Sequence, residues 1–159
     1  MKKAAKKKVN PVPKGYSVLT PHLTIKGAAQ ALDFYTKAFG AKTRMRMEGP
    51  GGLIMHAEMQ IGDSILMLAD ENPERGTRAP EGNGASPASV FLYISDVDAV
   101  FAKAKAAGAK VQSPPADMFW GDRFGQLTDP FGHNWGIATH VEDVSPKEME
   151  ARMAAQAPR

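Results

Sequence analysis

Polar and ionisable side chains that could do chemistry alternate with apolar residues in two stretches of the chain. His56, Glu58 and Gln60 alternate in one stretch, and His22 lies in the other, between Ser17 and Ile25. Alternate residues of a β-strand point to the same face of the sheet. An imidazole and a carboxylate two residues apart on one face could act as base and acid, or could simply hydrogen-bond to each other. The sequence therefore predicts that His56 and Glu58 are a catalytic pair or a structural pair.

The turn after this stretch fixes how it pairs with the next strand. Gly62-Asp63 suits a two-residue hairpin turn with glycine first, which places Glu58 opposite Met67. One face of the hairpin is then apolar and suits packing under a helix; it carries Met55, Ala57, Met59, Ile61, Leu66 and Leu68. The opposite face, with His56 and Glu58, stays available to a ligand.

The elements that must position these side chains form a pattern that occurs twice. Apolar residues at helical spacing predict helices over residues 28–39 and 97–107, each followed by a glycine, and Asp96 or Ser95 could cap the second. Strands are expected at residues 17–25, 42–48, 53–69 (a hairpin), 89–94 and 123–140 (a hairpin). A further strand follows the second helix and ends at about residue 112, before a loop at Pro114-Pro115. The predicted fold class is α+β: two βαβββ modules forming a cup-shaped eight-stranded half-barrel with helices outside.

The last hairpin decides which of its side chains face the cup. Asp129-Pro130-Phe131-Gly132 suits a type I turn. If the loop has four residues, Arg123 pairs with Ala138 and faces the cup. Arg123 could instead form an ion pair with its neighbour Asp122.

Charge and composition bound the function classes. Five lysines lie in residues 1–8, and without them fifteen basic residues face seventeen acidic ones, so the body is not a basic nucleic-acid binder. No apolar run is long enough for a membrane helix, and the absence of cysteine excludes thiol chemistry. We expect a cytoplasmic protein with a basic flexible tail (1–14), a single domain (15–142) and a C-terminal helical tail (143–159). The domain divides into modules at 15–70 and 89–142, joined by an exposed linker at 71–88.

Two motifs resemble a known family. LDFYTKAFGAK and TDPFGHNW are similar to motifs of the PhnB-like branch of the vicinal oxygen chelate superfamily, in the glyoxalase and bleomycin-resistance group. The resemblance covers roughly residues 15–142. It implies paired modules, a cup-shaped site and often a homodimer that completes the cup. The superfamily includes isomerases, dioxygenases, antibiotic-modifying enzymes and metal-free drug-binding proteins.

The metal-ligand positions of that family can be compared with this sequence. By the matching patterns they fall on Thr20, Met67, Ser89 and Gly136. A glyoxalase-type site needs imidazole or carboxylate groups at these positions, and none of the four residues supplies one. The resemblance therefore implies no metal at the usual site. A relocated divalent ion on His22, His56 and Glu58 stays open as an alternative.

The predicted cup suits a planar or amphipathic small molecule. Its candidate ligand-binding residues are Thr20, His22, Gln60, Met67, Phe91, Tyr93, Trp120, Arg123 and Asn134, beside the candidate catalytic residues His56 and Glu58.

Three hypotheses follow. The first is a bleomycin-resistance-type protein that binds a small anionic or aromatic molecule without metal or other cofactor. The second is an enzyme of the same superfamily (lyase, isomerase or dioxygenase) using a relocated metal or metal-free acid/base chemistry. The third is an interaction module that uses the basic tail. A homodimer is expected because open sheet edges and apolar surface need a cover.

Overall fold

The chain folds as two successive βαβββ modules, as predicted. The structure, a computed structural model, describes residues 9–82 and 86–156. The predicted basic tail therefore lies partly outside the described residues. The elements are β1 His22–Ile25, α1 Ala28–Phe39, β2 Lys42–Glu48, η1 Pro50–Gly52, β3 Ile54–Ile61, β4 Ser64–Asp70, η2 Pro73–Arg75, β5 Ser89–Tyr93, α2 Val97–Ala106, β6 Lys110–Asp117, β7 Asp122–Thr128, β8 Asn134–His140 and α3 Pro146–Gln156.

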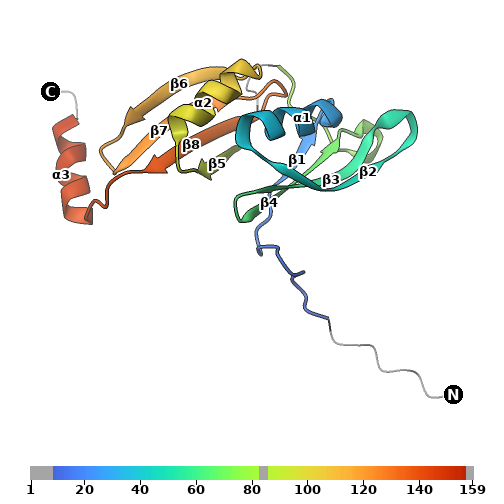
Figure 1. The fold of residues 1–159 in the computed structure, drawn as a ribbon, viewed down its shortest axis with the longest axis horizontal. Coiled ribbons are helices and arrows are strands. Elements are labelled where there is room, and N and C mark those ends of the chain that lie inside the picture. The colour runs from blue at the N-terminus through green and yellow to red at the C-terminus, as the bar shows by residue number, and fades with distance from the viewer. Residues whose placement is uncertain (1–8, 83–85, 157–159) are drawn as a thin grey trace, which may run out of the picture.

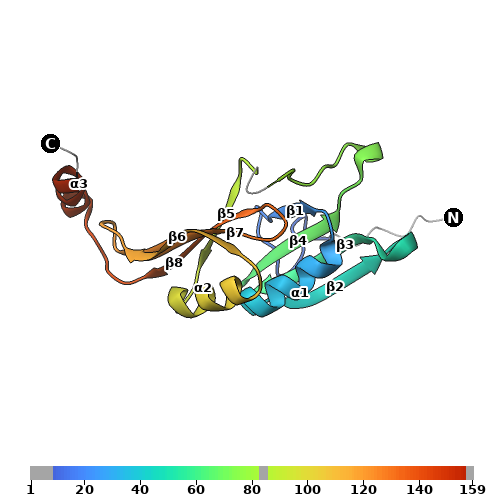
Figure 2. The same cartoon turned by 90° about the horizontal axis from the view of Figure 1, so that it is seen from above.

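Each module forms one four-stranded mixed sheet. The strand orders are β1-β4-β3-β2 and β5-β8-β7-β6, and in each sheet the first strand runs parallel to the fourth. The modules follow one another along the molecule (Figure 1), and α1 and α2 lie side by side against the same side of the two sheets (Figure 2). We call the other side of the sheets the open face. This arrangement confirms the predicted fold class. Among the described residues, no helix is both long and apolar enough to span a membrane.

Two aspartates start the helices. Asp70, at the end of β4, accepts hydrogen bonds from the Gly27 and Ala28 amides at the start of α1 (3.0 and 2.9 Å) and from the Ile54 amide of β3 (2.7 Å). An anion at a helix N-terminus satisfies free N–H groups and complements the helix dipole. Asp96 caps α2 by accepting from the Ala99 amide, as predicted. The carboxylate of Asp70 therefore also ties α1 to its own sheet.

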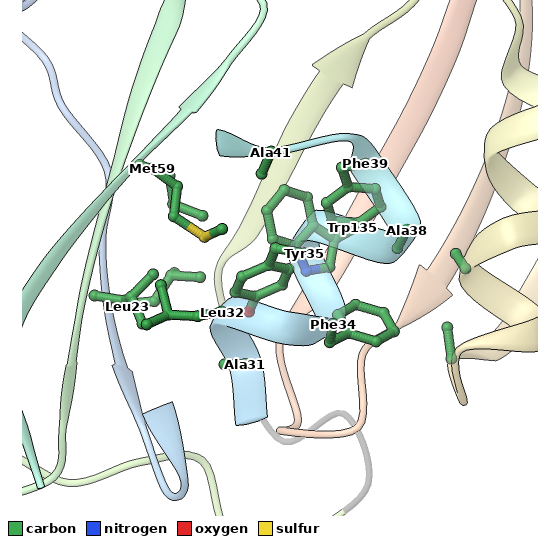
Figure 3. Close-up of a cluster of buried hydrophobic side chains, with 14 of the residues drawn as sticks. Leu23, Ala31, Leu32, Phe34, Tyr35, Ala38, Phe39, Ala41, Met59 and Trp135 are labelled. Atoms are coloured by element: carbon green, nitrogen blue, oxygen red, sulfur yellow. The ribbon is translucent and has the colours of Figure 1, made fainter. Parts of the chain in front are cut away.

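The core lies between the helices and the sheets and joins the modules. Trp135 of β8 is 1% exposed and packs against Tyr35 and Phe39 of α1, with ring centroids 5.3 and 4.6 Å apart (Figure 3). The buried Asp129 carboxylate accepts from the Tyr35 hydroxyl (2.7 Å) and from the Trp135 indole N–H (2.9 Å). His133 fastens the same loop to β1 through the Thr24 carbonyl (3.0 Å). Trp135 and Tyr35 are therefore core residues that join the two modules.

Several local predictions differ from the structure. The first strand begins at His22 and not at residue 17. Pro114 and Pro115 lie inside β6 instead of a loop, because β6 is an edge strand with a register shift there, and an edge tolerates the missing N–H groups. Met55, which was predicted to pack under a helix, is 49% exposed, whereas Ile54 is buried. The cause is a register shift between β2 and β3 near this end. The described part of the linker is folded: Asn72 pairs with Thr77, and Ala79 is buried.

The predicted pairing of Arg123 with Ala138 is wrong. The predicted turn is present, with the Gly132 amide bonded to the Asp129 carbonyl, but His133 adds a fifth loop residue, so Arg123 pairs with Thr139. A shift of one residue moves a strand's side chains to the opposite face. Arg123 therefore points toward α2.

The guanidinium of Arg123 forms ion pairs on that side. It donates to both oxygens of Asp98 on α2 (2.6 and 2.8 Å) and to Asp117 of β6 (3.1 Å). These bonds raise the pKa of Arg123 and lower the pKa of Asp98. Arg123 thus fastens α2 to its sheet, and it does not pair with Asp122.

The first prediction concerns Asp129. Asp129→Ala should lower the free energy of unfolding by about 3–5 kcal/mol, because it leaves the buried Tyr35 hydroxyl and Trp135 N–H without acceptors. Urea denaturation measures the change. Asp63→Ala, in the exposed turn of the other hairpin, is the matched control and should change it by less than about 0.5 kcal/mol. Equal losses in the two variants would contradict the assignment.

The second prediction concerns Arg123. Arg123→Ala should lower the melting temperature at low ionic strength, and the difference should shrink in high salt because these ion pairs are partly exposed. Ligand affinity should not change. Arg78→Ala, for which the structure describes no ion pair, serves as control. A loss of ligand affinity in Arg123→Ala alone would show that the residue acts at the site.

Candidate functional site

The open face of the first module carries a row of three predicted site residues. His22, Met67 and Glu58 are register partners across β1, β4 and β3. His56 lies on the same strand face as Glu58, and its ring stacks on that of His22 with centroids 6.2 Å apart. The structure therefore brings together the predicted residues His22, His56, Glu58 and Met67.

Glu58 is the centre of this group. Its side chain is buried, and one carboxylate oxygen faces the His56 Nε2 (3.2 Å) while the other accepts the Tyr16 hydroxyl (2.5 Å). The hydrogen bond from Tyr16, helped by His56, lowers the pKa of Glu58, and the same bond raises the pKa of Tyr16. The pKa of His22 is lowered mainly by partial burial and secondly by electrostatic repulsion from the neighbouring His56. At neutral pH the group thus presents one carboxylate with a phenol donor.

These side chains do not fit a relocated metal site. The His56 nitrogen nearest to Glu58 is engaged with its carboxylate, and the two imidazole rings lie nearly parallel, 19° apart. Across residues 9–82 and 86–156, no three His, Asp or Glu side chains form a group that could hold a metal ion.

The open face of the second module carries aromatic side chains. Phe91 stacks on Phe124 with centroids 5.5 Å apart and planes within 3°, and Tyr93 and Trp120 lie beside them at 5.0 Å from Phe91 and 5.9 Å from Phe124. We call these four residues the aromatic wall. Gly136 lies beneath it: a Cβ there would come within 2.9 Å of Phe91 and 3.0 Å of Phe124. The absence of a side chain at Gly136 therefore makes room for the two stacked rings.

A second buried carboxylate holds the aromatic wall in place. Asp122 is 3% exposed and accepts from the Tyr93 hydroxyl (3.0 Å), the Trp120 indole (3.1 Å) and the His140 Nδ1 (2.7 Å). The hydrogen bond to Asp122 raises the pKa of Tyr93, and bonds to Asp143 and Asp122 raise the pKa of His140. Because its oxygens already have three donors, Asp122 positions the wall and offers little to a ligand.

A cavity of about 480 Å³ adjoins the aromatic wall at the junction of the modules. Its lining includes Thr20, Ile65, Phe91, Tyr93 and Trp135 and is mostly apolar. Phe91 and Tyr93 are 50% and 62% exposed, so much of their surface is available to a partner molecule. This cavity brings together the predicted residues Thr20, Phe91 and Tyr93.

Three predicted residues lie apart from these groups. Gln60 donates to the Gly62 carbonyl of its own hairpin (2.9 Å). Asn134 donates to the Ser86 carbonyl and accepts from the Thr128 hydroxyl, at the linker end of the second sheet. Arg123 faces α2, as described above. Each of these side chains is engaged with neighbouring groups of its own module.

Sequence reasoning missed Tyr16, Phe124 and the role of Asp122. Tyr16 precedes the first alternating residues, so no periodicity placed it near Glu58. Phe124 and Asp122 share the strand of Arg123, and the one-residue register error moved them to the wrong face. The signal in the sequence was the glycine at position 132. A type I turn followed by a residue with positive φ is a standard hairpin connection, and Gly132 has a φ of 90°. This connection lengthens the loop by one residue.

Comparisons with known proteins agree with this architecture. Residues 18–137 match the Glyoxalase/Bleomycin resistance protein/Dioxygenase superfamily. The protein Mb0911c of Mycobacterium bovis is 40% identical over 141 residues, which are 87% of this chain and 93% of that protein. The crystal structure of TioX from Micromonospora sp. ML1 is 30% identical, with 79% of this chain and 99% of that chain covered and a TM-score of 0.64.

A solved PhnB protein shares the fold. This protein from Bacillus cereus, described as a putative 3-demethylubiquinone-9 3-methyltransferase, is 21% identical, with 77% of this chain and 99% of that chain covered and a TM-score of 0.60. The motifs, the two modules and these matches agree. The chain therefore belongs to the Glyoxalase/Bleomycin resistance protein/Dioxygenase superfamily.

Proposed function

We propose that this protein binds a small molecule with an aromatic part on the open face of its sheets, without a metal ion, as a bleomycin-resistance-type member of its superfamily. The observation that carries the proposal is the aromatic wall over Gly136, where the family's metal chemistry would require a ligand side chain. Stacked rings bind planar molecules by dispersion and by burial of apolar surface.

The charges around the site favour a neutral ligand. The expectation of an anionic ligand depended on Arg123, which faces α2 instead. On the open face, the Glu58 and Asp122 carboxylates would repel an anion, and Glu58 favours a group that donates a hydrogen bond.

A second candidate is an enzyme that uses metal-free acid/base chemistry. The favouring observation is the His56 Nε2 beside the Glu58 carboxylate (3.2 Å) on a face that a ligand could reach. The same Glu58 carboxylate, held by two hydrogen-bond partners, is also sufficient to bind a ligand without catalysing a reaction. Turnover of a bound ligand by the wild type, lost in His56→Ala, would favour the enzyme.

We also propose that the protein forms a homodimer. Leu19 is 87% exposed, and the exposed rings of Phe91 and Tyr93 lie on the same cavity. Apolar surface of this kind is normally covered in a stable protein, and β1 and β5 are edge strands that a second copy could shield. A second copy would enclose the open face and exclude water from the bound molecule.

The third prediction tests ligand binding. Calorimetric titration of purified protein with a panel of neutral aromatic compounds (indole, quinoline and 2-naphthol) should identify a binder that stays bound after treatment with a chelator. Phe91→Ala should weaken that binder by about tenfold, the scale of an aromatic contact. Met153→Ala, an exposed apolar residue on α3, should not. The proposal would be overturned if no compound binds, or if the chelator removes a metal ion and binding is lost together with it.

The fourth prediction tests assembly. Light scattering at micromolar concentration should give about twice the chain mass of 17.1 kDa. Leu19→Asp should shift the protein toward the monomer, because a charge would be buried at the covered face. Val9→Asp, at a residue that is 85% exposed, should have no effect. A monomeric wild type would contradict the homodimer.

A further inference from the structure

The segment before β1 places a phenol on the Glu58 carboxylate. Residues 13–16 make a turn closed by the Tyr16 amide and the Pro13 carbonyl (3.1 Å), and the Tyr16 hydroxyl then reaches Glu58 (2.5 Å). The guanidinium of Arg44 lies 5.7 Å from the centre of the Tyr16 ring. The buried acceptor of the open face is thus already occupied by a hydroxyaromatic group of the same chain.

We propose that Tyr16 stands in for the ligand, and that the molecule bound on this face is a phenol whose hydroxyl replaces that of Tyr16 on Glu58. This inference rests on the proposed function, since it names a ligand class for the same open face. A neutral hydroxyaromatic molecule supplies a strong donor for Glu58 and a flat ring for the space beside Tyr16.

Glu58 suits such an exchange better than the other buried carboxylate of the open face. The oxygens of Asp122 receive three donors from its own module. Glu58 keeps His56 on one oxygen, while its other oxygen depends on Tyr16, which comes from 42 residues away along the chain. Removal of Tyr16 therefore leaves an acceptor that needs a new donor.

The segment that carries Tyr16 is lightly held. Val18 and Leu19 are 93% and 87% exposed, and the Thr20 hydroxyl bonds within the segment, to the Ser17 carbonyl (3.0 Å). A cavity of about 390 Å³ lies between this segment and the sheet, where Met67 lines it. The segment can therefore withdraw without disturbing the core, and the space beside Tyr16 can admit a ring.

The test uses 4-methylphenol, which has the chemistry of the tyrosine side chain, and 4-methylanisole, which lacks the donor. In full-length protein, Tyr16→Ala should bind 4-methylphenol about tenfold tighter than the wild type, because a tethered competitor is gone. Lys14→Ala, at an exposed residue of the same segment that does not line the cavity, should match the wild type. Adding Glu58→Gln to Tyr16→Ala should weaken 4-methylphenol about tenfold and leave 4-methylanisole unchanged.

Two outcomes separate this inference from the proposed function. Equal binding of the two compounds, unaffected by Glu58→Gln, would overturn the phenol assignment while aromatic binding stands. The same holds if neither compound binds any variant while indole or quinoline, which lack a phenolic hydroxyl, still binds. If the panel fails as well, both proposals fall.

A measurement on the wild type covers the case in which Tyr16→Ala does not fold. The chain has three tyrosines, so 3-fluorotyrosine labelling should give three fluorine signals, with Tyr16 assigned by its absence in Tyr16→Phe. Saturation with 4-methylphenol should shift the Tyr16 signal, and 4-methylanisole should not. An unchanged Tyr16 signal at saturation would overturn the inference.

Discussion

The arrangement of the two modules depends on the hydrogen bonds that the buried Asp129 carboxylate accepts. It accepts hydrogen bonds from Tyr35 of the first module, from Trp135 of the second, and from the Phe131 and His133 amides of its own loop. A charge can remain in a nearly dry environment only when its oxygens are satisfied in this way. One side chain therefore fixes the helix, the hairpin loop and the aromatic core relative to each other.

The hydrogen-bonded carboxylates described above divide into two kinds. Asp70 and Asp129 accept mainly backbone amides and core donors, which are fixed by the fold, so they act as structural residues. Glu58 lies on the open face, where part of its hydrogen bonding comes from a segment with few other attachments. The same functional group thus stabilises the fold where its donors are rigid, and at Glu58 it depends in part on a donor from a lightly attached segment.

The open face of the second module combines the topology of the superfamily with an aromatic surface. The strands and helices of the superfamily are present, but at Gly136 the backbone lies beneath two phenyl rings. The aromatic wall is held by Asp122 through Tyr93 and Trp120, so its geometry depends on hydrogen bonds made behind the rings. Aromatic surface and one hydrogen-bond acceptor are the requirements of a binding site for a neutral planar molecule.

The sequence by itself determined most of the local elements and, apart from the end of β3 at Met55, the faces of the central hairpin of the first module. Helical spacing gave α1 with its observed bounds, and the Gly62-Asp63 turn gave the pairing of Glu58 with Met67, because both follow from short-range backbone geometry. The tertiary structure decided the rest. One added loop residue, His133, turned Arg123 away from the open face and Phe124 toward it, since strand side chains alternate. Contact between Tyr16 and Glu58 depends on how the chain crosses the sheet, which no local pattern encodes.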